Sequence, residues 1–138
     1  MRYSTLGFLT LALILTAALA APLFAHHSFA AEYDSKQPIT VKGAVTKVEW
    51  MNPHVYFYID VKDEQTGKIA NWAFEMGAPA VIQRNGFMRN TMKIGDMVIV
   101  SGTRAKSGAT HGNARTVTMA STGKKLGAGS SEGETPEQ

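Results

Sequence analysis

Much of the chain alternates between apolar and polar residues with a period of two, which is typical of β-strands that have one buried face. Five runs show this alternation: residues 39–50, 55–61, 70–76, 97–103 and 115–119. In the first run the apolar phase changes near Thr46 and Lys47. Such a change predicts a β-bulge or a bend at this point of the strand.

One segment with helical character lies between the third and fourth runs. Pro79 suits the first position of a helix and Gly86 the position just past its end, so residues 80–85 are expected to form a short helix. Residues 107–112 are small or polar and predict a loop. The order of these elements predicts a mainly β fold, a small five-stranded antiparallel barrel of the oligonucleotide/oligosaccharide-binding (OB) type. Another small antiparallel barrel or roll is the alternative.

The two ends of the chain differ from this central part. Residues 1–25 contain a single charge at Arg2, an apolar stretch and then small residues, which is the layout of a secretory signal peptide with cleavage after Ala20 or Ala25. An uncleaved membrane anchor is the alternative, but no charged residue directly follows the apolar run. We expect an extended arm at residues 26–38, the folded domain at residues 39–126 and a disordered tail at residues 127–138.

Composition narrows the classes of function. The 138 residues favour a single domain, and the absence of cysteine excludes disulfides, thiolate metal sites and cysteine nucleophiles. The net charge of +3 would suit a nucleic-acid partner, but an exported chain meets little nucleic acid. We therefore expect a periplasmic or secreted protein with no nucleic-acid partner and no transmembrane segment after cleavage.

Histidine is the main candidate for metal binding because imidazole is the commonest metal ligand in proteins. All four histidines follow the leader: His26, His27, His54 and His111. If cleavage follows Ala25, the amine and the ring of His26 could chelate one ion, and further imidazoles would complete a nitrogen-rich site of the kind that Cu(II) favours. Cleavage after Ala20 would instead make His26 and His27 part of a solvated arm.

A second candidate surface follows from the phase of the second and third runs. Tyr56 and Tyr58 share the phase of His54, and Asn71 and Glu75 have the outward phase of the next run. In OB-type barrels this surface commonly binds ligands, and these side chains could stack on a ring-bearing ligand and hydrogen-bond to it. The alternative is that they only stabilise the strand pair.

The sequence contains no nucleophile elbow, no phosphate-binding glycine-rich loop followed by lysine and no His-Glu-x-x-His motif. We therefore expect a binding module for a small ligand, with copper as the proposed cofactor, and not an enzyme. The alternative is a non-catalytic accessory or structural protein that docks on an envelope partner. An enzyme with a metal centre at the mature amino terminus is the third interpretation.

Three motifs carry a resemblance to a known family. They read A-H-H-S-F-A at residues 25–30 followed by Y-D at 33–34, then G-x-V-x-x-V-x-W-x-N-P-H at 43–54, and G-D-x-V at 95–98. Together they resemble an uncharacterised, domain-of-unknown-function family of small exported bacterial proteins, over about Ala25 to Leu126. The resemblance implies export and a small β-barrel-like domain, and it brings no established functional residues with it.

Overall fold

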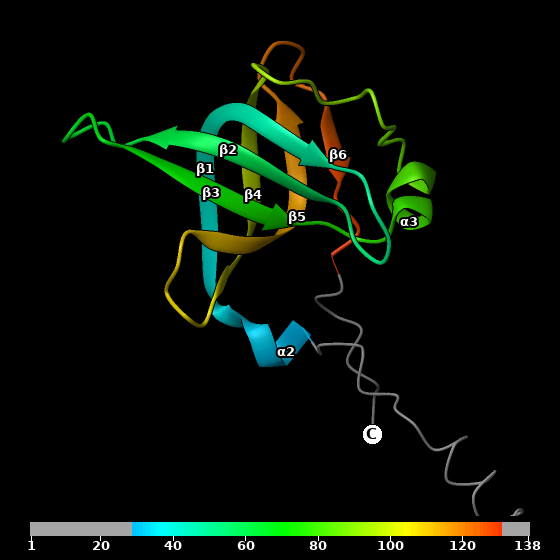
Figure 1. The fold of residues 1–138 in the computed structure, drawn as a ribbon, viewed down its shortest axis with the longest axis horizontal. Helices are drawn as coiled ribbons and strands as arrows, with labels where there is room; N and C mark the ends of the chain where they lie inside the picture. The colour runs from blue at the N-terminus through cyan, green and yellow to red at the C-terminus, as the bar shows by residue number, and fades with distance from the viewer. Residues whose placement is uncertain (1–28, 131–138) are drawn as a thin grey trace, which may run out of the picture.

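The computed structural model describes residues 29–130, so the leader, His26 and His27 lie outside the described residues. The elements are α2 (Phe29–Glu32), β1 (Tyr33–Glu49), β2 (Tyr56–Lys62), β3 (Ile69–Glu75), α3 (Pro79–Arg84), β4 (Met97–Ala105), β5 (His111–Met119) and β6 (Lys125–Gly127) (Figure 1). Within the described part, no helix is long and apolar enough to cross a membrane.

The strands form one sheet with the order β3-β2-β1-β4-β5-β6, and β3 also pairs with β5. Strands β1 to β5 therefore form a closed ring, in which β3 and β5 run parallel and the other neighbours run antiparallel. The long, curved β1 makes this ring possible because it pairs with both β2 and β4 (Figure 1). The predicted mainly β fold with one short helix between the third and fourth strands is confirmed, and β6 adds a sixth strand.

The first strand bends as expected but begins earlier. The register between β1 and β2 shifts between Val45 and Lys47, where the apolar phase changes along the sequence. The strand starts at Tyr33 and follows the short helix α2, so the expected extended arm is, from residue 29, a helical turn and the beginning of β1. A second register shift lies between Tyr33 and Pro38 and interrupts the alternation. The start of β1 could therefore not be recognised from the pattern of apolar and polar residues.

Strand β5 also begins earlier than the alternation indicates. The loop expected over residues 107–112 ends before His111, because His111 to Asn113 pair with Ala73 to Glu75 of β3.

At the C-terminal end of the described residues, Ala128 is fully buried and the described chain continues to Ser130. Residues 127–130, expected in the tail, therefore belong to the folded part.

The apolar faces of the strands pack together as the core. Phe57 and Phe74 are register neighbours on β2 and β3, and their ring centroids lie 5.5 Å apart. Burial of each such side chain stabilises the fold by about 1.5–3 kcal/mol. Ile82 of α3 is also fully buried in this core. The opposite face of β3, near its end, is covered by Tyr33 and becomes the candidate site described next.

Candidate functional site

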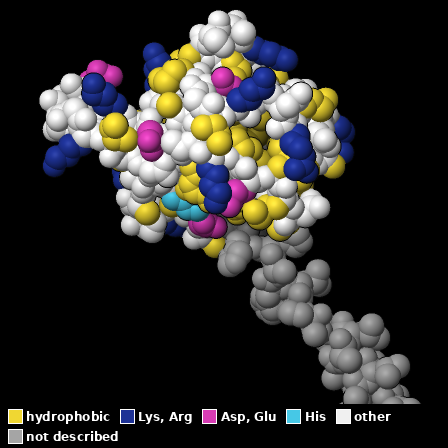
Figure 2. Space-filling view, turned by 45° about the horizontal axis from the view of Figure 1, so that its top comes forward, with side chains coloured by type: hydrophobic (Ala, Val, Ile, Leu, Met, Phe, Trp, Pro, Cys, Tyr) yellow, Lys and Arg dark blue, Asp and Glu magenta, His cyan; other side chains and the backbone are white. Residues whose placement is uncertain are grey.

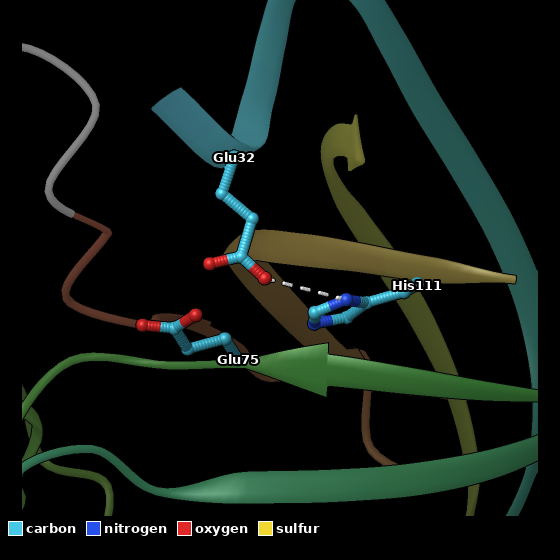
Figure 3. A group of neighbouring side chains, drawn as sticks. All are labelled: Glu32, Glu75 and His111. Carbon is cyan, nitrogen blue, oxygen red and sulfur yellow. Dashed lines mark ion pairs between the residues drawn. The ribbon is translucent and has the colours of Figure 1, made fainter. Parts of the chain in front are cut away.

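Three polar side chains from distant parts of the chain meet at the closure of the ring (Figure 3). Glu32 ends α2, Glu75 ends β3 and His111 begins β5. One ligand atom from each of the three lies within 4.8 Å of the others, which is a spacing that could hold a metal ion. Their convergence follows from topology, because the parallel pairing of β3 with β5 brings the last two together.

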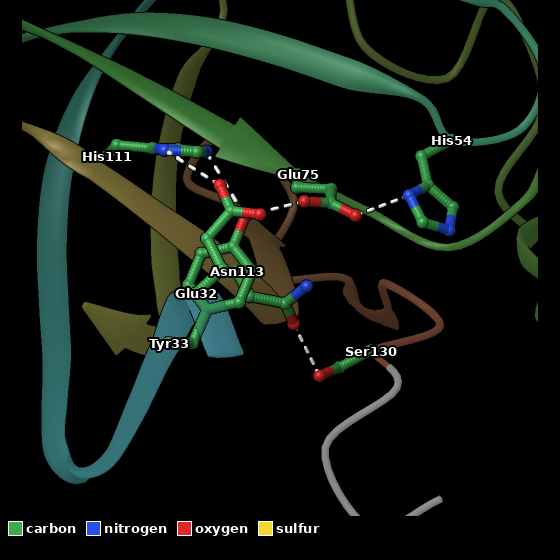
Figure 4. A network of polar contacts seen from close by, with 7 residues as sticks. All are labelled: Glu32, Tyr33, His54, Glu75, His111, Asn113 and Ser130. Atoms are coloured by element: carbon green, nitrogen blue, oxygen red, sulfur yellow. Dashed lines mark hydrogen bonds and ion pairs between the residues drawn. The ribbon is translucent and has the colours of Figure 1, made fainter. Parts of the chain in front are cut away.

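Glu75 is the centre of this group and is only 7% exposed. Its Oε2 accepts a 2.5 Å hydrogen bond from the Tyr33 hydroxyl, and its Oε1 forms an ion pair with Nδ1 of His54 (Figure 4). A buried carboxylate is costly unless its oxygens are paired. The phenol and the imidazole supply one partner to each oxygen.

The contacts of His111 leave one of its ring nitrogens facing a carboxylate. Its Nε2 lies 3.1 Å from the Tyr33 hydroxyl oxygen. Because the single hydroxyl proton of Tyr33 goes to Glu75, Nε2 of His111 must be the donor in this second contact. In a neutral ring the lone pair is then on Nδ1, which lies 3.6 Å from Oε1 of Glu32. Two acceptors at this separation are stabilised by a cation between them, either a proton on Nδ1 or a metal ion.

Both tyrosines beside Glu75 are held in their neutral form. Burial, followed by the Glu75 carboxylate, raises the pKa of Tyr33 above its ordinary value. Burial and then Glu75 also raise the pKa of Tyr56, its register neighbour, to about 12. At neutral pH these phenols therefore act as hydrogen-bond donors and not as anionic ligands.

The C-terminal segment forms another wall of the site. Asn113 is buried at 3% exposure and is the register neighbour of Glu75. Its Oδ1 accepts a 2.5 Å hydrogen bond from the Ser130 hydroxyl (Figure 4). The amide of Gly77 donates to the carbonyl of Ala128 at 2.8 Å and fixes the same segment. The site thus lies where the beginning and the end of the described chain meet.

The surface expected on the second and third strands divides into two groups. His54, Tyr56 and Glu75 lie at the ring closure, and Glu75 is buried there because Tyr33 covers it. Tyr58 and Asn71 have the expected phase but lie farther along the strands, in register with Ala73 and Asp60 respectively.

The second group makes local contacts of its own. Tyr58 donates a 2.8 Å hydrogen bond to Glu49, and Lys47 pairs with the same carboxylate. The amide nitrogen of Asn71 donates to Oδ1 of Asp60 at 2.7 Å. Contacts of this kind stabilise neighbouring strands, and a ligand-binding role for Tyr58 and Asn71 stays a prediction.

The space-filling view shows how charged side chains are distributed over one face of the molecule (Figure 2). Lys and Arg side chains are spread over the visible face, whereas a histidine side chain lies directly beside acidic side chains near its lower edge (Figure 2).

A family model described as a family of unknown function (DUF6152) matches residues 13–115. The chain belongs to this family. The matched range of DUF6152 contains all of Glu32, His54, Glu75 and His111. No curated protein matches the chain. No solved structure matches it either.

Two residues of the site in this DUF6152 chain, Glu32 and Tyr33, escaped the sequence reasoning. They lie directly after the H-H-S-F motif, in a segment without periodicity, so only the family resemblance at Tyr33 drew attention to them. His54 was singled out with Glu75 because the two share a phase, and the structure brings them into contact. His111 was singled out only as a histidine.

Proposed function

We propose that this protein is an exported binding module that holds a divalent transition-metal ion at Glu32, Glu75 and His111. The observation that carries the proposal is the convergence of these three donors within 4.8 Å of one another. The orientation of His111 adds support, because its Nδ1 faces the Glu32 carboxylate at a distance of 3.6 Å.

Copper is the ion that we propose for this site. Imidazole nitrogen and carboxylate oxygen are suitable ligands for Cu(II), which binds most tightly among the divalent first-row ions in the Irving–Williams order. His54 acts as a supporting partner that orients Glu75 through Nδ1, while its Nε2 points away from Glu75 (Figure 4). We further propose His26 and His27 as additional nitrogen donors, since the sequence places them a few residues before Glu32.

The metal-binding test uses a substitution on the more exposed side of the site. We expect Glu32→Gln to lower the affinity for Cu(II) by at least about tenfold, because it removes an anionic ligand from a surface helix that buries no residue. Glu64→Gln removes an equal charge from the exposed turn between β2 and β3 and serves as the control. Isothermal titration calorimetry of the purified protein measures both. Equal affinities for all three proteins would reject the proposed site.

Export has its own test at the amino terminus. We expect protein recovered from the periplasm of a bacterial host to begin at Ala21 or at His26, as the three-part leader indicates. Intact-mass spectrometry determines the terminus. A start at His26 adds its free amine to the donors available near Glu32, and a chain that retains residues 1–20 would contradict cleavage.

A second candidate function is that of an accessory protein that docks on an envelope partner. An open groove of about 440 Å³ supports it, with Lys42, Lys62, Ile69 and Met97 among its lining residues. Ile69 and Met97 are 65% and 43% exposed, so the groove presents two large apolar side chains to solvent. This function takes precedence if neither Cu(II) nor Zn(II) binds.

A further inference from the structure

The segment Phe29–Tyr33, here called the strap, carries Glu32 onto the ring (Figure 3). Its helical part buries no residue. Lys106 holds this part from outside: its amide donates to the Glu32 carbonyl at 2.9 Å, and its Nζ donates to the Ala30 carbonyl at 2.5 Å. Tyr33 anchors the other end through its buried ring and its bond to Glu75. The strap is therefore docked mainly through one side chain and a few polar contacts.

An irregular joint, with a register shift between Tyr33 and Pro38, connects the strap to the rest of β1. Tyr33 pairs with Ala105 and the next paired residue, Pro38, pairs with Thr103, so the intervening residues of β1 outnumber those of β4. The extra residues loop out and are closed locally by Asp34, which accepts hydrogen bonds from the Lys36 amide and the Gln37 side chain. Because this loop makes its own hydrogen bonds, the strap can leave the ring by giving up the pairing of Tyr33 with Ala105, while β1 stays paired with β4 from Pro38 onward.

Docking of the strap has an electrostatic cost that depends on what lies between the carboxylates. It brings the Glu32 carboxylate into the same cluster as the buried Glu75 carboxylate. Like charges at this range repel, and a low-dielectric surrounding strengthens the repulsion. A divalent cation bound to both carboxylates replaces their mutual repulsion by the attraction of each carboxylate to the ion. The docked form then gains the stabilisation that one additional ligand gives to the ion.

We propose that the strap is a metal-dependent clasp, so that an ion bound at Glu32, Glu75 and His111 locks the N-terminal segment onto the ring. The inference rests on the proposed metal site and adds a coupling between that site and the docking of the strap. The coupling is reciprocal. If docking raises the affinity for the ion by a given factor, the bound ion raises the equilibrium constant for docking by the same factor. Couplings between binding and a two-state element are commonly about 5-fold to 150-fold.

Hydrogen–deuterium exchange with peptide-level mass spectrometry tests the clasp. The amide of Lys106 reports docking because it donates to the Glu32 carbonyl, and the peptide that contains the strap is followed beside it. Saturating Cu(II) is expected to slow exchange at these positions by at least about fivefold. The turn between β2 and β3, at the far end of the hairpin, should exchange at the same rate with and without the ion (Figure 1).

Calorimetry on the same samples separates the two proposals. Binding of Cu(II) with no change in exchange at the strap and Lys106 would overturn the clasp and leave the metal site intact. No binding at all would overturn both. Glu32→Gln supplies the matched variant: at saturating Cu(II) it should lose the slowed exchange, whereas Glu64→Gln should keep it. Slowed exchange that persists in Glu32→Gln would also overturn the clasp, because the ion would then act without the ligand that the strap brings.

Discussion

Replacing Glu75 by alanine is expected to abolish measurable Cu(II) binding and to destabilise the protein even without metal. The substitution removes the buried ligand at the centre of the cluster, so we expect a loss of affinity of at least about 100-fold. It also takes away the acceptor of the buried Tyr33 hydroxyl and the ion-pair partner of His54. An unsatisfied buried polar group costs about 1–3 kcal/mol of the free energy of unfolding. Calorimetry and urea unfolding, followed by tryptophan fluorescence, measure the two effects.

Glu49→Ala is the matched control for this experiment. Glu49 also accepts a hydrogen bond from a tyrosine, Tyr58, and also pairs with a cationic side chain, Lys47, but it lies at the surface. Exposed pairs contribute about 0–1 kcal/mol, so this variant should unfold close to the wild type and bind Cu(II) with unchanged affinity. Equal effects of the two substitutions would show that Glu75 has no special position in the fold or the site.

The substitution Gly102→Ala is expected to lower the free energy of unfolding by about 3 kcal/mol, the upper end of the usual range for overpacking. Gly102 lies on β4 next to a register shift against β5, and an added Cβ would lie 2.0 Å from the Asn113 carbonyl oxygen. That obstacle is backbone and cannot move aside as a side chain would. The two strands must separate locally, which also disturbs the segment that carries Asn113 beside the site.

Gly67→Ala provides the comparison for the glycine substitution. Gly67 has a φ of +71° in the turn between β2 and β3, and an added Cβ there would meet no atom within 4 Å. Its cost is conformational only, roughly 1–2 kcal/mol. Urea unfolding of both variants, fitted with a common m-value, measures the difference between their free energies of unfolding. A Gly102→Ala protein as stable as Gly67→Ala would contradict the close approach of β4 to β5.

The parts of the fold that were predictable are those in which one physical signal dominates. The alternation of Phe57 and Ile59 with Tyr56 and Tyr58 identified β2 because one face is buried in the core. The phase change near Thr46 identified the bulge, since a shift of one residue exchanges the two faces of a strand. Pro79 correctly marked the beginning of α3, and Gly86 correctly marked the region just past its end.

The parts that were not predictable depend on contacts between distant segments. His111 and Gly112 resemble a loop in sequence because they are flanked by small residues. They form a strand because β3 pairs with both of them and β4 pairs with Gly112. Glu32 and Tyr33 lie in a segment without periodicity, whose docking depends on Glu75 and Lys106. A pattern along one segment contains no information about such a partner. The site was therefore foreseen at His54, Glu75 and His111 as separate candidates, and not as one cluster.

For the proposed metal site, the closure of the ring by β3 and β5 also determines when during the life of the molecule an ion could be captured. The three donors are far apart in the chain and belong to elements that meet only through pairings of distant strands. Folds dominated by such contacts form slowly, in about milliseconds to seconds. A chain that is still being synthesised lacks β5 until late, and an unfolded chain has no arrangement of these donors at all. If the protein binds the proposed ion, loading with metal follows folding and takes place in whichever compartment the finished ring first exists.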